Sequence, residues 1–187
     1  TTRLLAGLLA GQRFQCIIDR DDSIRKRPMG RIIKPLNSMG ANIMGHNGNN
    51  FCPLTIHGRP LHGIRYTLPV ASAQLKSALL LAGLYADGET ILIEPEKSRD
   101  HSERLLNYFG ANIRVDGTAV HCIPISQLNP QHIIVPGDIS SAAYFMVAAL
   151  ITPDSEILIK NVGINPTRTG IIDVLKAMGG KISMYNI

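Results

Sequence analysis

Long apolar stretches, with polar residues between them, predict an alternation of helices and strands along this chain. Residues 72–84 and 140–150 are apolar on nearly every side, a pattern typical of helices buried on most of their surface. A third helix of this kind is expected from Thr1 onward. Short apolar runs predict strands before and after the two complete buried helices, at residues 64–68, 90–93, 132–135 and 157–160.

One eight-residue pattern occurs three times, with leucine first, glycine fifth and isoleucine eighth. Each copy predicts a helix that ends at a glycine in the left-handed conformation and is followed by a strand. The glycines are 70 and then 69 residues apart, at Gly40, Gly110 and Gly179. This spacing indicates an internal structural repeat.

A hairpin is predicted after each of the first two copies, with turns near Asn47-Gly48 and Asp116-Gly117. The third copy supplies one strand from Lys181, and we expect its partner to lie beyond the end of this chain. The sequence therefore predicts an α/β domain of three β-α-β-α-β-β repeats, with buried helices inside and sheets and more polar helices outside. The repeats span about 1–60, 61–128 and 129–187, and the third is incomplete.

Composition indicates a globular protein with an anionic partner. Of the 187 residues, 45% are apolar and 18% charged, which excludes a disordered segment, and the net charge is +5. The longest apolar runs reach about half of the ~20 residues that a membrane-spanning helix needs. Aromatic residues make up 5% and tryptophan is absent, which argues against a platform for single-stranded nucleic acid. The three cysteines are far apart, so we expect no disulfide, no metal and a cytoplasmic location.

Polar side chains stand at the start of each predicted buried helix, at Thr1, Ser72 and Ser140. Each alone is an ordinary N-cap. If the repeats are related by rotation about a common axis, the three helices point the same way and their N-termini share one face. That face would bind an anion, because every free helix end offers unpaired N–H groups and about half a positive charge.

Basic residues are densest from Arg25 to Arg31. Pro28 fits the first position of a helix and restricts the residue before it, so Arg27 is predicted at a helix entrance, where a guanidinium can grip a carboxylate or phosphate. Arg99 and Arg168 each stand seven residues before a repeat leucine. We expect one of these two arginines to bind ligand and the other to be structural.

Five segments taken together resemble the first large domain of the 3-phosphoshikimate 1-carboxyvinyltransferase family, also called 5-enolpyruvylshikimate-3-phosphate synthases. They begin at Arg25, Ala71, Ser98, Gly137 and Asn165, and read RKRPMGR, ASAQLKSA, SRDH, GDISSA and NPTRTG. The resemblance implies an inside-out α-β prism with buried parallel helices. It also implies transfer of the enolpyruvyl group of phosphoenolpyruvate to the 5-hydroxyl of shikimate 3-phosphate, without metal or organic cofactor.

Residue by residue, the resemblance implies the following substrate contacts. Arg27 would bind phosphoenolpyruvate, Gln74 both substrates, and Ser72, the backbone at Ala73 and Arg99 the phosphate of shikimate 3-phosphate. The family's Lys-Ser pair, its L-G-N-x-G-T loop and its second domain, which carries the proton-transferring residues, are missing here. No catalytic residue is therefore expected in this chain, which we expect to be an inactive piece of a longer enzyme that binds shikimate 3-phosphate at about 1 mM.

Two other interpretations stay open at this stage. The first is a related enolpyruvyl transferase acting on UDP-N-acetylglucosamine, although the mobile-loop cysteine of that family has no counterpart among Cys16, Cys52 and Cys122. The second is a non-catalytic phosphate- or RNA-binding module built on the same repeat. Such a module would bind RNA with a steep dependence on salt.

Overall fold

The computed structural model describes residues 1–19 and 21–185. They form two compact units, Thr1–Gln131 and His132–Ile187. Among the described residues, no helix is both long and apolar enough to cross a membrane.

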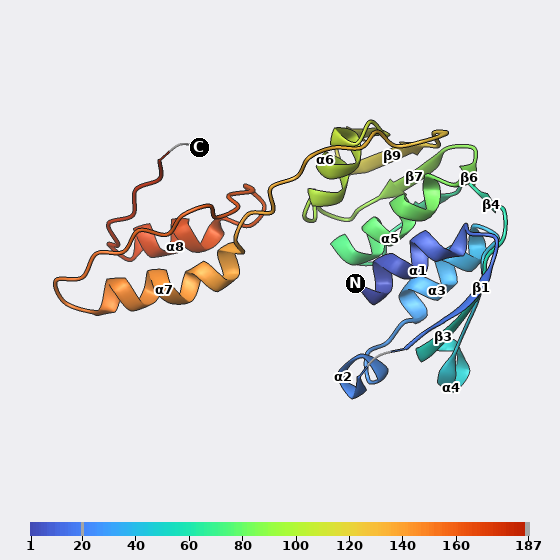
Figure 1. Cartoon of the computed structure of the whole chain (residues 1–187), viewed down its shortest axis with the longest axis horizontal. Helices are drawn as coiled ribbons and strands as arrows, with labels where there is room; N and C mark the ends of the chain where they lie inside the picture. Colours follow the sequence, from blue (N-terminus) through green and yellow to red (C-terminus); the bar gives the residue numbers. More distant parts are fainter. Residues whose placement is uncertain (20, 186–187) are drawn as a thin grey trace. The chain divides into compact units, whose positions relative to one another are not determined.

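Unit 1 contains six helices and nine strands among its described residues (Figure 1). The helices are α1 (Thr2–Ala10), α2 (Asp22–Arg25), α3 (Gly30–Ser38), α4 (His46–Asn49), α5 (Ala73–Gly83) and α6 (His101–Tyr108). The strands are β1 (Gln15–Ile18), β2 (Asn42–Gly45), β3 (Phe51–His57), β4 (Leu61–His62), β5 (Arg65–Thr67), β6 (Ala86–Asp87), β7 (Thr90–Ile93), β8 (Asn112–Asp116) and β9 (Ala119–Ile123). Apart from the short strand β6 between α5 and β7, the order β5-α5-β7-α6-β8-β9 is the repeat unit that the sequence predicted, present once in full.

Unit 1 contains three sheets among its described residues. The first has the order β1-β3-β2 and is antiparallel. The second has the order β5-β7-β9-β8, in which β5 and β7 are parallel and the other neighbours antiparallel. Strands β4 and β6 form a short parallel pair.

Helices α1, α3 and α5 lie side by side and run in the same direction (Figure 1). At their N-terminal ends, the Arg3 side chain in α1 contacts both Gln74 in α5 and the carbonyl of Pro28 before α3. At the opposite ends, carbonyls at the C-termini of α1 and α3 accept hydrogen bonds from Arg59 and His62. The strand that holds His62 pairs with β6, directly after α5. Three helix N-termini are therefore brought to one end of the bundle.

The contact between α1 and α5 depends on Gly7. A Cβ atom at this position would lie 2.0 Å from the backbone oxygen of Ala78. Gly7 and Ala78 are both buried, so a side chain at Gly7 could not turn outward into solvent. The absence of a side chain at Gly7 lets the two helix backbones come into direct contact.

The three copies of the repeat end their helices in the same way. In each copy the glycine N–H donates to the carbonyl three residues back, and the next N–H donates to the repeat leucine, at 2.9–3.1 Å. The glycines have φ angles of 98°, 87° and 92°, at Gly40, Gly110 and Gly179. This is the Schellman motif, in which a left-handed residue closes the helix. The predicted helix ends are confirmed.

An asparagine joins helix to strand in the first two copies. The Asn37 side chain donates to the Ile43 carbonyl at 3.0 Å and accepts from the Ile43 N–H at 2.9 Å. Asn107 makes the same pair of bonds to Ile113, at 2.8 and 2.9 Å. The equivalent position in the third copy is Lys176, which makes no such bridge in the described part of the chain.

Both predicted hairpins are present. Strands β2 and β3 are joined across Asn47 and Gly48, whose φ angles are both positive, 46° and 66°. Strands β8 and β9 pair from Asp116 and Ala119 outward, and Gly117 between them has φ of 56°. Asn-Gly and Asp-Gly turns tolerate positive φ, which matches the twist of the flanking strands.

Unit 2 differs from the prediction in the surroundings of its apolar helix. It contains α7 (Ile139–Ile151) and α8 (Gly170–Ala177). Helix α5 is buried along most of its length, as predicted, whereas α7 buries only Ile139 and Ala142. Tyr144 and Ile151 expose 81% and 75% of their surface. A helix that is apolar on all sides is covered only where neighbours pack around it, and within unit 2 α7 faces mainly α8 and loops.

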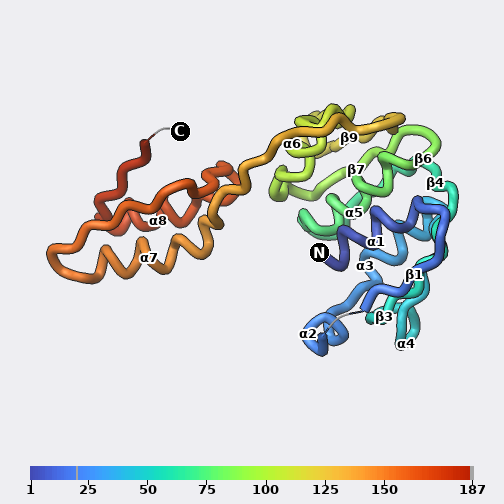
Figure 2. Tube along the Cα trace, in the orientation of Figure 1, coloured from blue at the N-terminus to red at the C-terminus, as the bar shows by residue number. Residues whose placement is uncertain are grey.

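The strands predicted at 132–135 and 157–160 are not formed. After α7 the chain turns back and runs beside the helices before α8 begins (Figure 2). The chain before α7 and the chain between α7 and α8 are paired only by one isolated bridge, between Gly137 and Val162. A strand needs a neighbouring strand along its length, and no strand of the described residues pairs with either segment; Ile134 is 80% exposed.

Candidate anion-binding site

The first turn of α5 holds three of the predicted site residues. Ser72 is the N-cap, and its hydroxyl accepts a hydrogen bond from the Leu75 N–H at 3.4 Å. Ala73 and Gln74 are the first helical residues, with Gln74 exposed. The N–H groups of Ala73 and Gln74 have no acceptor within the helix, so this end offers backbone donors and partial positive charge.

Arg3 connects the N-terminal ends of the three helices. Its guanidinium donates to the Gln74 side-chain oxygen at 2.5 Å and to the Pro28 carbonyl at 3.2 Å. Two buried polar atoms nearby in the first turn of α1, Arg3 Nε and Thr2 Oγ1, have no hydrogen-bond partner among the described residues. Arg3 thus orients Gln74 and ties the segment before α3 to the start of α5.

Positive charge accumulates around Arg3. Burial lowers the pKa of Arg3, and the charges of Arg31 and then Arg27 lower it further. Arg27 and Arg31 are both exposed, and neither side chain has an ion-pair or hydrogen-bond partner in the described part of the chain. Three guanidinium groups within electrostatic reach repel one another, so an anion bound between them would be stabilised.

The position of Arg27 relative to α3 differs from the prediction. The helix begins at Gly30 with Met29 as N-cap, so Pro28 precedes the helix instead of occupying its first position. The Met29 N–H donates to the Asn50 carbonyl at 2.6 Å, which ties this residue to the β2–β3 connection and delays the first turn. Arg27 lies in the link between α2 and α3, and its exposed side chain is available to a ligand.

Arg99 lies in the loop that leads into α6, one residue before the Asp100 N-cap. Its side chain is exposed and forms no hydrogen bond or ion pair among the described residues. The loop is fixed to the side of α5, because Lys76, one turn beyond Ser72, forms an ion pair with Glu94, and Glu94 accepts hydrogen bonds from Ser98.

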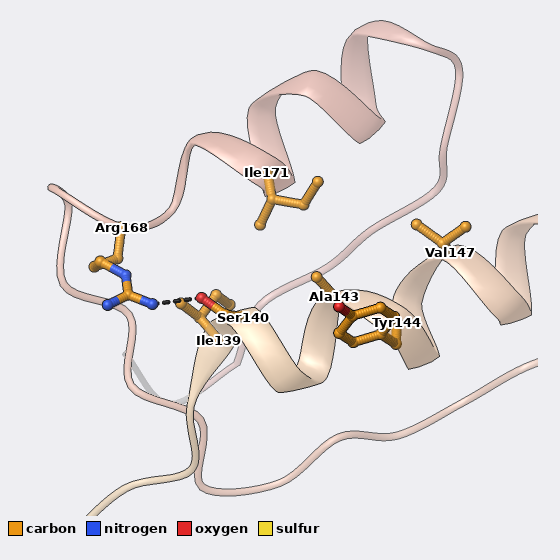
Figure 3. A pocket seen from close by; sticks show the side chains of 7 residues that line it. All are labelled: Ile139, Ser140, Ala143, Tyr144, Val147, Arg168 and Ile171. Atoms are coloured by element: carbon orange, nitrogen blue, oxygen red, sulfur yellow. Dashed lines mark hydrogen bonds between the residues drawn. The ribbon is translucent and has the colours of Figure 1, made fainter. Parts of the chain in front are cut away.

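Arg168, the equivalent of Arg99, is engaged within unit 2. It donates to Asp138 at 3.1 Å and to the Ser140 hydroxyl (Figure 3). Asp138 in turn caps α7 by accepting from the Ser140 N–H at 3.1 Å. Of the two arginines, Arg168 therefore has the structural contacts, and Arg99 is the one whose guanidinium is available.

A cavity of about 540 Å³ lies between α7 and α8. Its lining is mostly apolar, with Arg168 and Ser140 at one end (Figure 3), and comprises Ile139, Ser140, Ala143, Tyr144, Val147, Arg168 and Ile171. The hydroxyl of Ser140 and the guanidinium of Arg168 are bound to each other there. That the start of α7 shares a face with Ser72 and Arg27 stays a prediction.

The groups at the start of α5 suit recognition of an anion. Across residues 1–19 and 21–185, no group of three or more His, Cys, Asp or Glu residues is placed to hold a metal ion. The available groups are guanidinium donors, backbone N–H groups, one hydroxyl and one amide, all of which bind phosphate or carboxylate oxygens.

Comparison with known proteins decides the family. A family model described as EPSP synthase (3-phosphoshikimate 1-carboxyvinyltransferase) matches residues 1–186. The chain belongs to the EPSP synthase family.

Individual members of the EPSP synthase family match 95–100% of this chain but less than half of their own length. The 3-phosphoshikimate 1-carboxyvinyltransferase of Geobacillus kaustophilus is 58% identical over 187 residues, which are 44% of the relative. That of Geotalea daltonii is 59% identical over 184 residues, 43% of its length. The solved structure of EPSP synthase from Acinetobacter baumannii superposes with a TM-score of 0.86 and is 49% identical in sequence. The match covers 95% of this chain and 40% of that one.

The comparison confirms the α/β fold of the EPSP synthase family for this chain. The arrangement of three equivalent repeats as a prism stays a prediction. The structure also adds Arg3, Lys76 and Glu94 to the site, none of which was predicted. For Lys76 the available signal was one ammonium group in an otherwise apolar helix, and for Arg3 it was a basic residue in the first turn of a predicted buried helix.

Proposed function

We propose that this chain is the shikimate 3-phosphate-binding part of an enzyme that transfers the enolpyruvyl group of phosphoenolpyruvate to the 5-hydroxyl of shikimate 3-phosphate. The observation that carries the proposal is the start of α5, where Arg3 is bonded to Gln74 and unpaired arginines lie nearby. In this proposal residues 1–187 form one domain of three repeats, and the enzyme acts in the shikimate pathway to the aromatic amino acids.

The phosphate of shikimate 3-phosphate binds at the N-terminus of α5 in this proposal. The Ser72 hydroxyl and the Ala73 N–H donate to phosphate oxygens, and Arg99 reaches the same group from the loop fixed to the side of α5. A helix N-terminus with an arginine beside it supplies both directed donors and positive charge. Support comes from the exposure of Arg99 and from the partnered state of its equivalent, Arg168.

Phosphoenolpyruvate binds beside this group, through Arg27. Gln74 contacts both substrates, and Arg3 holds its side-chain oxygen so that the amide N–H₂ group points away from Arg3 toward the ligands. The link between α2 and α3 keeps Arg27 exposed and close enough to Arg3 to affect its pKa. Two anions side by side require more than one cation, and the site has four arginines for them.

The chemical step requires groups that the site does not contain. Protonation of the enolpyruvyl carbon and deprotonation of the attacking hydroxyl need acids and bases within hydrogen-bond reach of the reacting atoms. Arginine stays protonated at neutral pH, and a serine hydroxyl and a glutamine amide do not ionise there. The catalytic groups are therefore supplied by a second domain, and the 187-residue chain alone has no turnover. We place the enzyme in the cytoplasm, consistent with three unbridged cysteines among the described residues.

The direct test is a titration of the 187-residue chain with shikimate 3-phosphate, followed by amide and arginine side-chain NMR. We expect saturable shifts at Ser72, Ala73 and Arg99 with a dissociation constant of about 1 mM. Arg99→Gln removes a charged hydrogen bond and is expected to weaken binding by about tenfold. Arg114→Gln is the matched control, since Arg114 is also an exposed arginine, on strand β8.

Three other results would contradict the proposal. The first is a folded chain that gives no saturable shift at the start of α5. The second is tighter binding of UDP-N-acetylglucosamine, or of a single-stranded RNA with a steep salt dependence. The third is release of phosphate from phosphoenolpyruvate by the chain alone, because the proposal assigns proton transfer to groups outside it.

A further inference from the structure

A buried ion cluster lies directly beneath the proposed phosphate site. The ammonium of Lys76 is 2.9 Å from a carboxylate oxygen of Glu94 and 2.6 Å from one of Glu103. The three side chains expose only 1%, 3% and 6% of their surface. They come from three different elements, since Lys76 is in α5, Glu94 follows β7 and Glu103 is in the first turn of α6.

A buried ion cluster contributes little net stability to a core. Removing an ion from water costs several kcal/mol, and replacing a buried ion pair by apolar residues is often neutral or stabilising. Here two carboxylates share one ammonium, and Glu103 Oε2 has no hydrogen-bond partner among the described residues. The positive end of the α6 dipole stabilises the charge of Glu103, but Glu94 lies outside a helix and has no such stabilisation.

The second oxygen of Glu94 holds the loop that carries Arg99. Glu94 Oε1 accepts from the Ser98 N–H at 3.3 Å and also from the Ser98 hydroxyl. Residues 95–97 and Arg99 are exposed, so the loop has little apolar packing of its own. Ser98 connects the loop to the rest of unit 1 by bonding to Glu94. Glu94 in turn pairs with Lys76, which lies one turn beyond the Ser72 cap.

We propose that Glu94 is a positioning residue, which acts through Ser98 to hold Arg99 at a fixed place relative to the first turn of α5. Lys76 and Glu103 orient Glu94, so that one carboxylate oxygen faces the ammonium and the other faces the loop. Arg99 and Ser72 are then preorganised to bind the same phosphate, and less conformational entropy is lost on binding. This inference rests on the proposed function, because it assigns Arg99 to a phosphate.

Ser98→Ala tests the proposal without disturbing the ion pair. It removes the hydroxyl bond to Glu94 but leaves Lys76 and both carboxylates in place. We expect shikimate 3-phosphate to bind the 187-residue chain about tenfold more weakly, as for loss of one charged hydrogen bond. Ser98→Thr keeps the hydroxyl and is expected to restore binding. Ser38→Ala is the matched control, because Ser38 bonds only to a backbone carbonyl at the far end of α3.

A double-mutant cycle separates positioning from a general loss of stability. On an Arg99→Gln background, Ser98→Ala should weaken binding by less than twofold, because the arginine it positions is gone. A loss of stability would weaken both backgrounds equally. Thermal unfolding is recorded for every variant, and Ser98→Ala is expected to lower the midpoint by no more than a few degrees.

The outcomes distinguish this inference from the proposed function. If the parent chain is folded and does not bind shikimate 3-phosphate, the proposed function fails and this inference fails with it. If the parent binds and Ser98→Ala binds equally well, or if the two substitutions are additive, the positioning role is wrong while the proposed function stands. Tenfold weakening with rescue by Ser98→Thr and non-additivity supports it.

Discussion

Replacing Gly7 with alanine should separate α1 from α5 and lower the stability of unit 1. The new Cβ would lie 2.0 Å from the Ala78 carbonyl oxygen, whereas side-chain atoms of this type essentially never come within 3.0 Å of a neighbour. The helices must therefore move apart by about 1 Å, and a gap of that size removes a quarter to a half of the dispersion energy of each contact along the seam. Together with the strain of overpacking, we expect a cost of about 2–4 kcal/mol.

Thermal unfolding of the 187-residue chain, followed by circular dichroism, measures this cost. For a unit of about 130 residues, 1 kcal/mol corresponds to roughly 3–5 °C, so the midpoint should fall by about 6–20 °C. Gly170→Ala is the control, because Gly170 is helical and has no atom within 4 Å of its Cβ position. A Gly7→Ala midpoint within about 2 °C of the parent would refute the close helix contact.

Three further predictions concern the stability of unit 1. Asn107→Ala removes the two bonds between α6 and β8 and should cost about 1–2 kcal/mol in urea denaturation, whereas Lys176→Ala, at the same repeat position, should be neutral. Burial raises the pKa of Cys122 from 9.0 to about 12, so the thiol ionises at a lower pH in the unfolded chain than in the folded chain. Cys122 should therefore make stability fall by up to ~1.4 kcal/mol per pH unit above about pH 9, and Cys122→Ala should make the fall less steep, with burial of Cys52, which also raises its pKa, leaving the remainder. Lys76→Met leaves two buried carboxylates without a counterion and should cost about 3–5 kcal/mol in the same assay, whereas Lys97→Met at the surface should be silent.

Features encoded within a few neighbouring residues could be predicted from the sequence. The three helix ends and the two hairpins depend on glycine and asparagine at fixed offsets, and the structure has each of them where the pattern indicated. The failures concern elements that need distant neighbours. The segments at 132–135 and 157–160 have strand-like composition but no partner strand, and α7 has an apolar surface that α8 alone does not cover.

The candidate site shows the same division. Ser72 as a helix cap and Arg99 before a helix follow from local patterns, and both lie where they were expected. The role of Arg3 depends on contacts with residues 25 and 71 positions away, which no local pattern contains. Helix α3 begins at Gly30, two residues later than the prediction that placed Pro28 at its first position, because Met29 bonds to Asn50, a contact set by tertiary structure.

The identical helix endings also bear on how the chain folds. Each ending closes through hydrogen bonds that span only four or six residues, so it forms without any long-range contact. Contacts between residues near in sequence form on the microsecond timescale, well before sheets assemble from distant strands. In pulse-labelling hydrogen exchange, the amides of Ala41, Ala111 and Gly180 should therefore gain protection early and together, at three separate points along the polypeptide.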